Sequence, residues 1–133
     1  MSPNSMHAGW LLRAPFAAVF LFHGAGKLAM PAASAQMLGL PTALVLLVGV
    51  AEVLAGLGAL AGGLPQLARA DLATRLSGLA AAPVLLGASA MVHWPRWSFT
   101  PSESHPMGGM EFQVVLLGMA VYFMVTGARE RAS

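Results

Sequence analysis

A long run from Leu44 to Gly63, LVLLVGVAEVLAGLGALAGG, is apolar except for one carboxylate, that of Glu52. As a helix rising about 1.5 Å per residue, this run is long enough to cross the roughly 30 Å hydrocarbon core of a bilayer. The whole chain of 133 residues is 57% hydrophobic and 9% charged, with a mean hydropathy of +0.72. Soluble domains carry about 25% charged residues, and a chain this short has too few polar residues to cover an apolar core. The sequence therefore predicts a membrane-embedded protein.

Three further segments have the same apolar character and similar length. They lack the alternation of apolar and polar residues that transmembrane strands show, and they are too long for strands. Pro41 suits the first turn of a helix, and Gly62-Gly63 followed by Pro65 suits a helix end. We predict an all-α membrane protein, an antiparallel bundle of four transmembrane helices that forms a single domain over residues 1–133. The predicted helices cover residues 10–30, 41–62, 71–93 and 109–127.

Charge and cysteine content narrow the function classes. The chain has no cysteine, which excludes disulfides, thiolate metal sites and thiol redox chemistry. Its net charge of +2 comes from a few basic residues, which we interpret as topology signals and not as a nucleic-acid surface. In a four-pass chain, Lys27 and Arg96 fall on one side of the membrane, and Arg13, Arg69, Arg75, Arg129 and Arg131 fall on the other. The positive-inside rule then predicts that both termini are cytoplasmic.

Glu52 needs an explanation, because a charge at the bilayer centre costs about 2.5–3.5 kcal/mol on insertion scales. Small residues surround it at helical spacing, and such residues let another helix approach closely. They are Gly49, Gly56, Ala59 and Gly63. We therefore expect Glu52 to face protein and to pair with Lys27, His23 or Arg75. Two interpretations stay open: an ion pair that fixes helix packing, or a proton-accepting or substrate-orienting carboxylate beside a pocket.

Other ionisable residues gather at the outer ends of the predicted helices. His23 and Lys27 are four residues apart, on one face of the first helix. His93 ends the third helix, and the loop that follows holds Glu103 and His105. Imidazole and carboxylate groups are ligands for Zn, Cu or Fe, so His93, His105 and Glu103 are a candidate metal site, although their spacing fits no established motif. Packing roles for these histidines are the alternative.

Four motifs together resemble one known family. They are R-x-P-F-x-x-x-F-x-F-H-G-A-G-K-L from Arg13, G-V-A-E-V-L-A-G-L-G around Glu52, T-R-L-S-G-L-A-A from Thr74, and G-G-M-E-F around Glu111. Their order resembles the DoxX family of four-helix bacterial membrane proteins. The resemblance implies a bacterial inner-membrane location and a link to quinone-dependent redox enzymes or redox-stress systems. It also implies that the recurring polar positions of the family fall here on Arg13, Lys27, Glu52, Arg75, His93 and Glu111.

These observations lead to a function hypothesis, a quinone-linked oxidoreductase subunit. Glu52, His23 and Lys27 would act on the quinone, through proton exchange at Glu52 and charge stabilisation at Lys27. His93, Glu111, Arg13 and Arg75 would contact the substrate. A redox or stress-system protein would be the partner and would supply electrons, and glycine-rich helix faces fit a homo-oligomer. The alternative is a non-enzymatic scaffold, or a small-solute or metal-binding component of a stress-response system, so enzymatic activity stays open.

Overall fold

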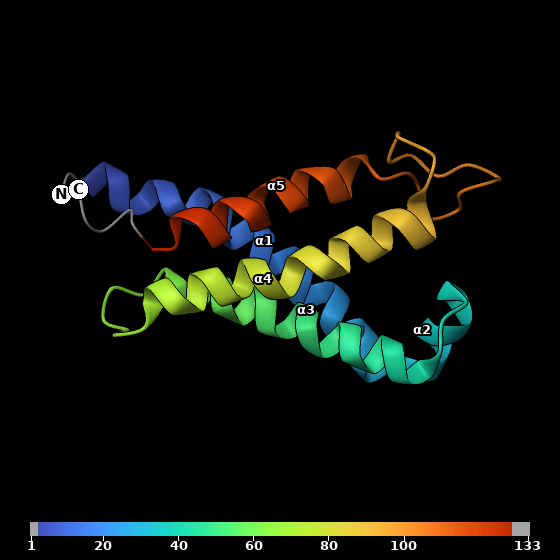
Figure 1. Cartoon of the computed structure of the whole chain (residues 1–133), viewed down its shortest axis with the longest axis horizontal. Coiled ribbons are helices and arrows are strands. Elements are labelled where there is room, and N and C mark those ends of the chain that lie inside the picture. Colours follow the sequence, from blue (N-terminus) through green and yellow to red (C-terminus); the bar gives the residue numbers. More distant parts are fainter. Residues whose placement is uncertain (1–2, 129–133) are drawn as a thin grey trace.

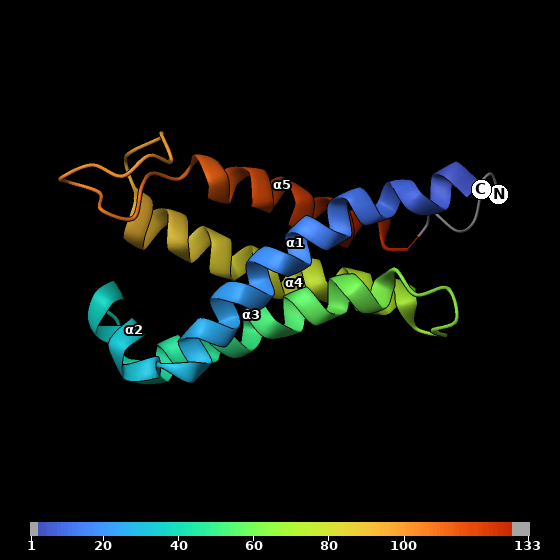
Figure 2. The same cartoon turned by 180° about the vertical axis from the view of Figure 1, so that it is seen from behind.

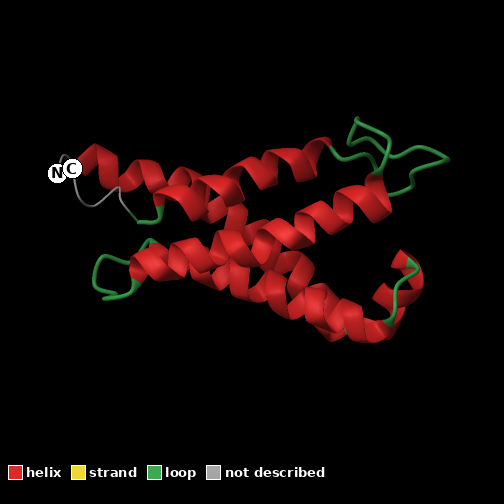
Figure 3. Ribbon diagram, viewed as in Figure 1, coloured by secondary structure: helices red, strands yellow, loops and turns green. Residues whose placement is uncertain are grey.

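The computed structural model describes residues 3–128, and this part of the chain contains helices and no strands (Figure 3). Three segments are long and apolar enough to span a membrane: Ala8–Ala29, Thr42–Gly62 and Ala70–His93. The prediction of an all-helical membrane protein agrees with these segments. The helices are α1 (Pro3–Ala29), α2 (Pro31–Leu38), α3 (Thr42–Gly62), α4 (Ala70–Ala88), the π-helical segment η1 (Ser89–His93) and α5 (Glu111–Thr126).

The long helices pack in chain order, α1 on α3, α3 on α4 and α4 on α5, and successive long helices run in opposite directions (Figure 1). At one end of the molecule, α1 and α3 diverge from α4 and α5, as the view from behind also shows (Figure 2). The short helix α2 and the loop of residues 94–110 both lie at this diverging end. The fold thus holds the helices together in the middle and separates the two pairs at one end.

Small residues allow the close helix contacts in the middle. A Cβ atom on Gly24 would lie 2.9 Å from the carbonyl oxygen of Gly49, so α1 and α3 touch backbone to backbone there. A Cβ atom on Gly56 would meet Leu21 of α1, which confirms that the predicted small-residue face of this helix packs against protein. Around these contacts lies a buried core of alanines and three aromatic rings, Phe16, Phe20 and Phe123.

The predicted helix over residues 41–62 agrees with α3, and the predictions 10–30, 71–93 and 109–127 each contain most of one observed helix. The sequence analysis missed α2, which returns the chain from α1 to the start of α3. Two local signals mark it: Pro31 in its first turn, and Gly39 just after its end with φ of 66°, a conformation that glycine adopts without strain.

Three of the basic residues, Arg69, Lys27 and Arg96, lie at the ends of the molecule to which the topology prediction assigns them. The loop before α4, which carries Arg69, lies at the same end as the start of α1 and the end of α5 (Figure 1). Lys27 and Arg96 belong to the opposite, diverging end. Arg129 and Arg131, which were part of the topology prediction, lie outside the described residues.

Candidate functional site

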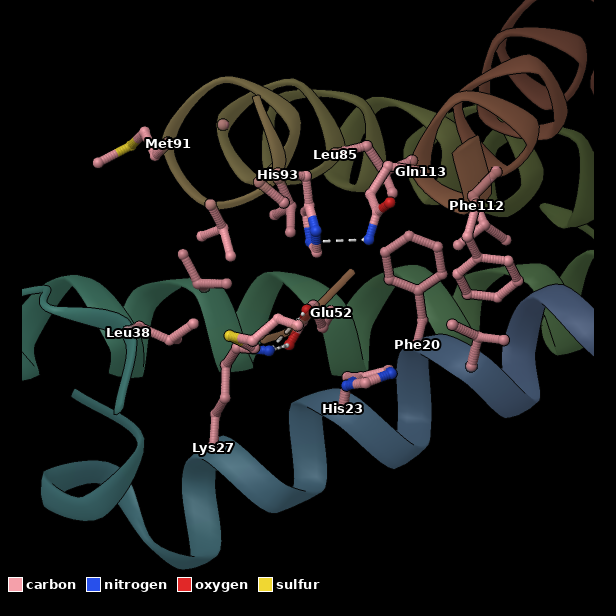
Figure 4. Close-up of a pocket in the computed structure, with 18 of the residues that line it drawn as sticks. Phe20, His23, Lys27, Leu38, Glu52, Leu85, Met91, His93, Phe112 and Gln113 are labelled. Carbon is pink, nitrogen blue, oxygen red and sulfur yellow. Dashed lines mark hydrogen bonds and ion pairs between the residues drawn. The ribbon is translucent and has the colours of Figure 1, made fainter. Parts of the chain in front are cut away.

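A pocket of about 450 Å³ lies between the two diverging helix pairs (Figure 4). Pockets that bind small molecules measure about 300–1,000 Å³ and are mostly apolar, with a few converging polar groups. This pocket has that composition, and its lining comes from all five α-helices of the described part of the chain, from η1 and from the loops beside them. The polar lining residues are His23, Lys27, Glu52, His93 and Gln113.

Lys27 and Glu52 form an ion pair across the α1–α3 contact. Nζ of Lys27 donates to both carboxylate oxygens of Glu52, at 3.0 Å and 2.9 Å. Their side chains are only 17% and 8% exposed. The close approach of Gly24 to Gly49 brings the two helices near enough for this pair. The prediction that Glu52 faces protein and meets a basic residue of the first helix is therefore confirmed, with Lys27 as the partner.

His93 and Gln113 form a second polar pair, on the opposite side of the pocket (Figure 4). Nδ1 of His93 lies 2.8 Å from the carbonyl oxygen of Gly108, which can only accept a hydrogen bond, so Nδ1 carries the hydrogen. In the neutral imidazole, Nε2 then accepts a hydrogen bond from the amide nitrogen of Gln113 at 2.9 Å. Within the described part of the chain, the buried Oε1 atom of Gln113 has no hydrogen-bond partner.

The loop of residues 94–110 places Gly108 beside His93. Backbone hydrogen bonds tie its two ends together, from Gly109 N to Ser98 O at 2.7 Å and from Glu111 N to Trp97 O at 2.9 Å. Gly108 has φ of 79°, and a Cβ atom there would collide with the carbonyl of Phe99. A glycine is needed at this position because only glycine combines that dihedral angle with such close backbone packing.

His23 lies one helical turn before Lys27 and also lines the pocket (Figure 4). It is exposed, and its ring is nearly perpendicular to that of Phe22, with a centroid distance of 5.4 Å. The structure thus brings together all three residues that were predicted to act on a substrate, His23, Lys27 and Glu52, together with His93.

Arg13 lies elsewhere. It is buried among α1, α3 and α4, and its Nη1 donates to the carbonyl of Ala59 at 3.1 Å and to Oγ1 of Thr74 at 3.0 Å. Its guanidinium carbon lies 5.2 Å from the ring centroid of Phe123. The sequence analysis treated Arg13 as a charge at the membrane edge and as a substrate contact, whereas the structure places it in the packed interior and not in the pocket lining.

Arg75 and Glu111 also lie outside the pocket lining. Arg75 donates to the carbonyl oxygens of Met124 and Val125, at 2.6 Å and 3.1 Å, and to Asp71 of its own helix. It therefore binds the last turn of α5 and does not pair with Glu52. Glu111 accepts a hydrogen bond from the backbone N–H of Phe99 at 3.2 Å, which holds the loop against the start of α5.

The candidate metal ligands are not gathered into a cluster. His105 is hydrogen-bonded through Nε2 to the carbonyl of Trp94 at 2.9 Å and through Nδ1 to Ser104 at 3.0 Å. Glu103 is exposed on the loop, and His93 faces Gly108 and Gln113. Among residues 3–128, no group of three His, Cys, Asp or Glu side chains is placed to hold a metal ion.

Sequence reasoning missed Gln113 as a site residue, together with the aromatic lining residues Phe20, Phe99 and Phe112. A signal for Gln113 was present, since an amide in an otherwise apolar helix needs a hydrogen-bond partner. No protein-family model, curated protein or solved structure matches the chain. The resemblance to the DoxX family therefore stays a prediction that rests on the four motifs.

Proposed function

We propose that this chain is a DoxX-like membrane protein whose pocket binds the head group of a membrane quinone as part of an oxidoreductase complex. The observation that carries the proposal is one mostly apolar pocket with two polar pairs, Lys27–Glu52 and His93–Gln113. A quinone ring is apolar on its faces and has polar oxygens at two opposite positions. An apolar pocket with a few polar groups suits such a ligand.

The polar residues fit the chemistry of quinone turnover. Reduction of a quinone to a quinol consumes two electrons and two protons, and the reverse reaction releases them. A carboxylate at the pocket wall, Glu52, can deliver or accept a proton, while the ammonium group of Lys27 offsets negative charge on Glu52 or on a ligand oxygen. The electrons would come from, or go to, a redox partner protein. Phe20, Phe99 and Phe112 offer faces against which the ring can pack.

We further propose that α5 is a fourth membrane crossing, which completes an antiparallel four-helix bundle in the bacterial inner membrane. Its 16 residues correspond to roughly 24 Å of helix at 1.5 Å per residue, slightly less than the bilayer core. The grouping of Arg69 with the start of α1 supports cytoplasmic termini by the positive-inside rule. The pocket would then face the outer leaflet, where a membrane-borne ligand reaches it laterally.

Mass spectrometry of the protein purified in mild detergent tests this function. The expected result is a co-purified quinone in the wild-type extract that is strongly reduced in Glu52→Gln. The matched control is Glu103→Gln, because Glu103 is exposed on the loop and outside the pocket lining. A well-folded wild-type protein that retains no quinone, and binds none when a short-chain quinone is added, would contradict the proposal and favour the scaffold alternative.

A further inference from the structure

We infer that the loop of residues 94–110 lies in the outer interface of the bilayer, with its aromatic side chains among the lipids, so that the pocket beneath it opens to lipid. The inference goes beyond ligand binding, but it rests on the proposed crossing of the membrane by α5. Its basis is the exposed aromatic surface of the loop, together with the depth at which hydrogen bonds hold the loop relative to α4 and α5.

The loop exposes large apolar side chains. Trp94, Trp97 and Phe99 are 65%, 55% and 62% exposed, and Met107 is 44% exposed. Tryptophan is enriched where a membrane meets water, because its ring is apolar and its N–H needs a polar partner. In the membrane-spanning segment before the loop, Met91 is also 63% exposed. The exposed apolar side chains thus continue along the chain from the membrane-spanning segment into the loop.

Hydrogen bonds between α4 and α5 hold the inner end of α5 in place. Arg75, in the second turn of α4, donates to the carbonyl oxygens of Met124 and Val125 at 2.6 Å and 3.1 Å. Asp71, in the first turn of α4, accepts a hydrogen bond from the backbone N–H of Ala128 at 2.9 Å. The ion pair of Asp71 and Arg75 belongs at the inner membrane surface, because charges are costly inside the hydrocarbon core. The last turn of α5 therefore lies at that surface.

The other end of α5 then lies at the outer edge of the core or below it. The 16 residues of α5 span roughly 24 Å, and any tilt of the helix shortens this span across the membrane. The hydrocarbon core is about 30 Å thick, so Glu111, the first residue of α5, lies no higher than its outer edge. The backbone N–H of Glu111 donates to the carbonyl oxygen of Trp97 at 2.9 Å. Trp97 is thus held at the depth where the lipid head groups begin.

The loop also borders the pocket and has a polar tip. Phe99 and Met107 line the pocket. Glu103 is exposed on a tight turn that backbone hydrogen bonds between Ser102 and His105 close, at 3.0 Å and 3.2 Å. An amphipathic segment lies in the interface with its apolar side toward the acyl chains and its polar side toward water. With the loop in that position, the edge of the pocket that Phe99 and Met107 border faces lipid, which suits a ligand carried in the membrane.

Cysteine accessibility tests the inference, because the chain contains no cysteine of its own. Trp97→Cys and the matched control Glu103→Cys each place one thiol on the loop, at positions that are both exposed in the structure. The full chain is inserted into lipid nanodiscs, which expose both membrane faces. The rate of reaction with a charged, water-soluble maleimide is measured relative to that of the denatured variant. We expect Trp97→Cys to react at least about tenfold more slowly than Glu103→Cys, since lipid excludes the reagent and disfavours the reactive thiolate.

Tryptophan fluorescence gives an independent measure of depth. Trp10→Phe leaves Trp94 and Trp97 as the tryptophans of the chain, and both belong to the loop. Lipids brominated near the top of their acyl chains should quench the emission of this variant strongly, and aqueous iodide should quench it little. If the variants of one experiment do not fold, the other experiment still decides.

Equal reaction rates of Trp97→Cys and Glu103→Cys, or an emission that iodide quenches and brominated lipid does not, would overturn the inference. The aromatic surface would then lie in water, free for a soluble protein partner. A green fluorescent protein fused to the C-terminus tests the crossing of α5 separately, because it becomes fluorescent in the bacterial cytoplasm and not outside it. A fluorescent fusion together with a loop in water would contradict the inference alone. A stably expressed but dark fusion would contradict the proposed crossing, and the inference with it.

Discussion

Nζ of Lys27 contacts both carboxylate oxygens of Glu52, at 3.0 Å and 2.9 Å, and so joins α1 to α3 inside an otherwise apolar contact. The pair lies next to a close backbone contact between the two helices, at Gly24 and Gly49. It therefore has two effects at once. It satisfies a carboxylate that would be costly to bury alone, and it places that carboxylate at the wall of the pocket.

Removing one partner of this ion pair should be more harmful than removing both. Lys27→Met alone leaves the charge of Glu52 without a partner, and Glu52→Gln alone leaves the charge of Lys27 facing a neutral amide. For either variant we expect a loss of about 3 kcal/mol in the free energy of unfolding. The double variant Lys27→Met/Glu52→Gln should be more stable than the less stable single variant. Thermal unfolding in detergent measures this, and additive losses in the double variant would show that the two side chains act independently.

Arg13 should be important for stability and unimportant for ligand binding. In Arg13→Lys, the shorter ammonium group cannot reproduce the planar guanidinium that reaches Ala59 O and Thr74 Oγ1, and we expect a loss of about 2 kcal/mol. The affinity for a short-chain quinol should stay within about twofold of wild type, because Arg13 is not part of the pocket lining. A large loss of affinity in a protein of unchanged stability would restore Arg13 as a substrate contact.

The buried position of Arg13 shows what hydropathy predicts and what it does not. The apolar runs were sufficient to predict the long helices, since length and composition determine what can cross a bilayer. The small residues around Glu52 predicted which face of that helix meets protein. However, Arg13 lies only five residues inside the first apolar segment, and its position in the sequence does not distinguish a membrane edge from a packed interior. Arg13 is held in the interior by its hydrogen bond to Thr74 on another helix. A contact between two distant residues cannot be recognised from one sequence.

Gly78 should be intolerant of a side chain, in contrast to Gly118. A Cβ atom on Gly78 would collide with the backbone carbonyl of Ala120 and force α4 and α5 apart, so Gly78→Ala should destabilise the protein by about 2 kcal/mol. Gly118 has open space around it, and Gly118→Ala should be neutral or stabilising by up to about 1 kcal/mol. Chemical denaturation in detergent compares the two variants, and equal effects would argue against close packing of α4 on α5.

Arg75 should stabilise the end of α5 and have little effect elsewhere. Arg75→Gln removes the donor that binds the carbonyls of Met124 and Val125, so the last turn should open more often. We expect amide hydrogen exchange at Gly127 and Ala128 to become about tenfold faster. The control is Arg96→Gln at the opposite end of the molecule, which should leave these amides unchanged. Unchanged exchange in Arg75→Gln would show that other contacts hold this end of α5.

The candidate site was predictable in part, for a physical reason. Spacing on a single helix placed His23 and Lys27 on one face, and the cost of burying Glu52 implied a partner for it. The second pair depends on three distant pieces of chain: η1 with His93, the loop with Gly108, and α5 with Gln113. Backbone hydrogen bonds hold the two ends of that loop together, and the identities of the side chains do not predict such bonds. Glu111 in turn was expected in the site, but it is used to hold the loop.

Photo-crosslinking with a quinone that carries a photoreactive group on its ring tests the central claim most directly. In protein purified in detergent, peptide mapping by mass spectrometry should find the label on pocket-lining residues, namely Val19, Leu44, Val48, Leu85 and Leu116 or their lining neighbours. An excess of unlabelled short-chain quinol should remove the label, and Glu52→Gln should weaken it. Label confined to outward-facing residues such as Leu57 or Val125, and unaffected by the competitor, would contradict the account.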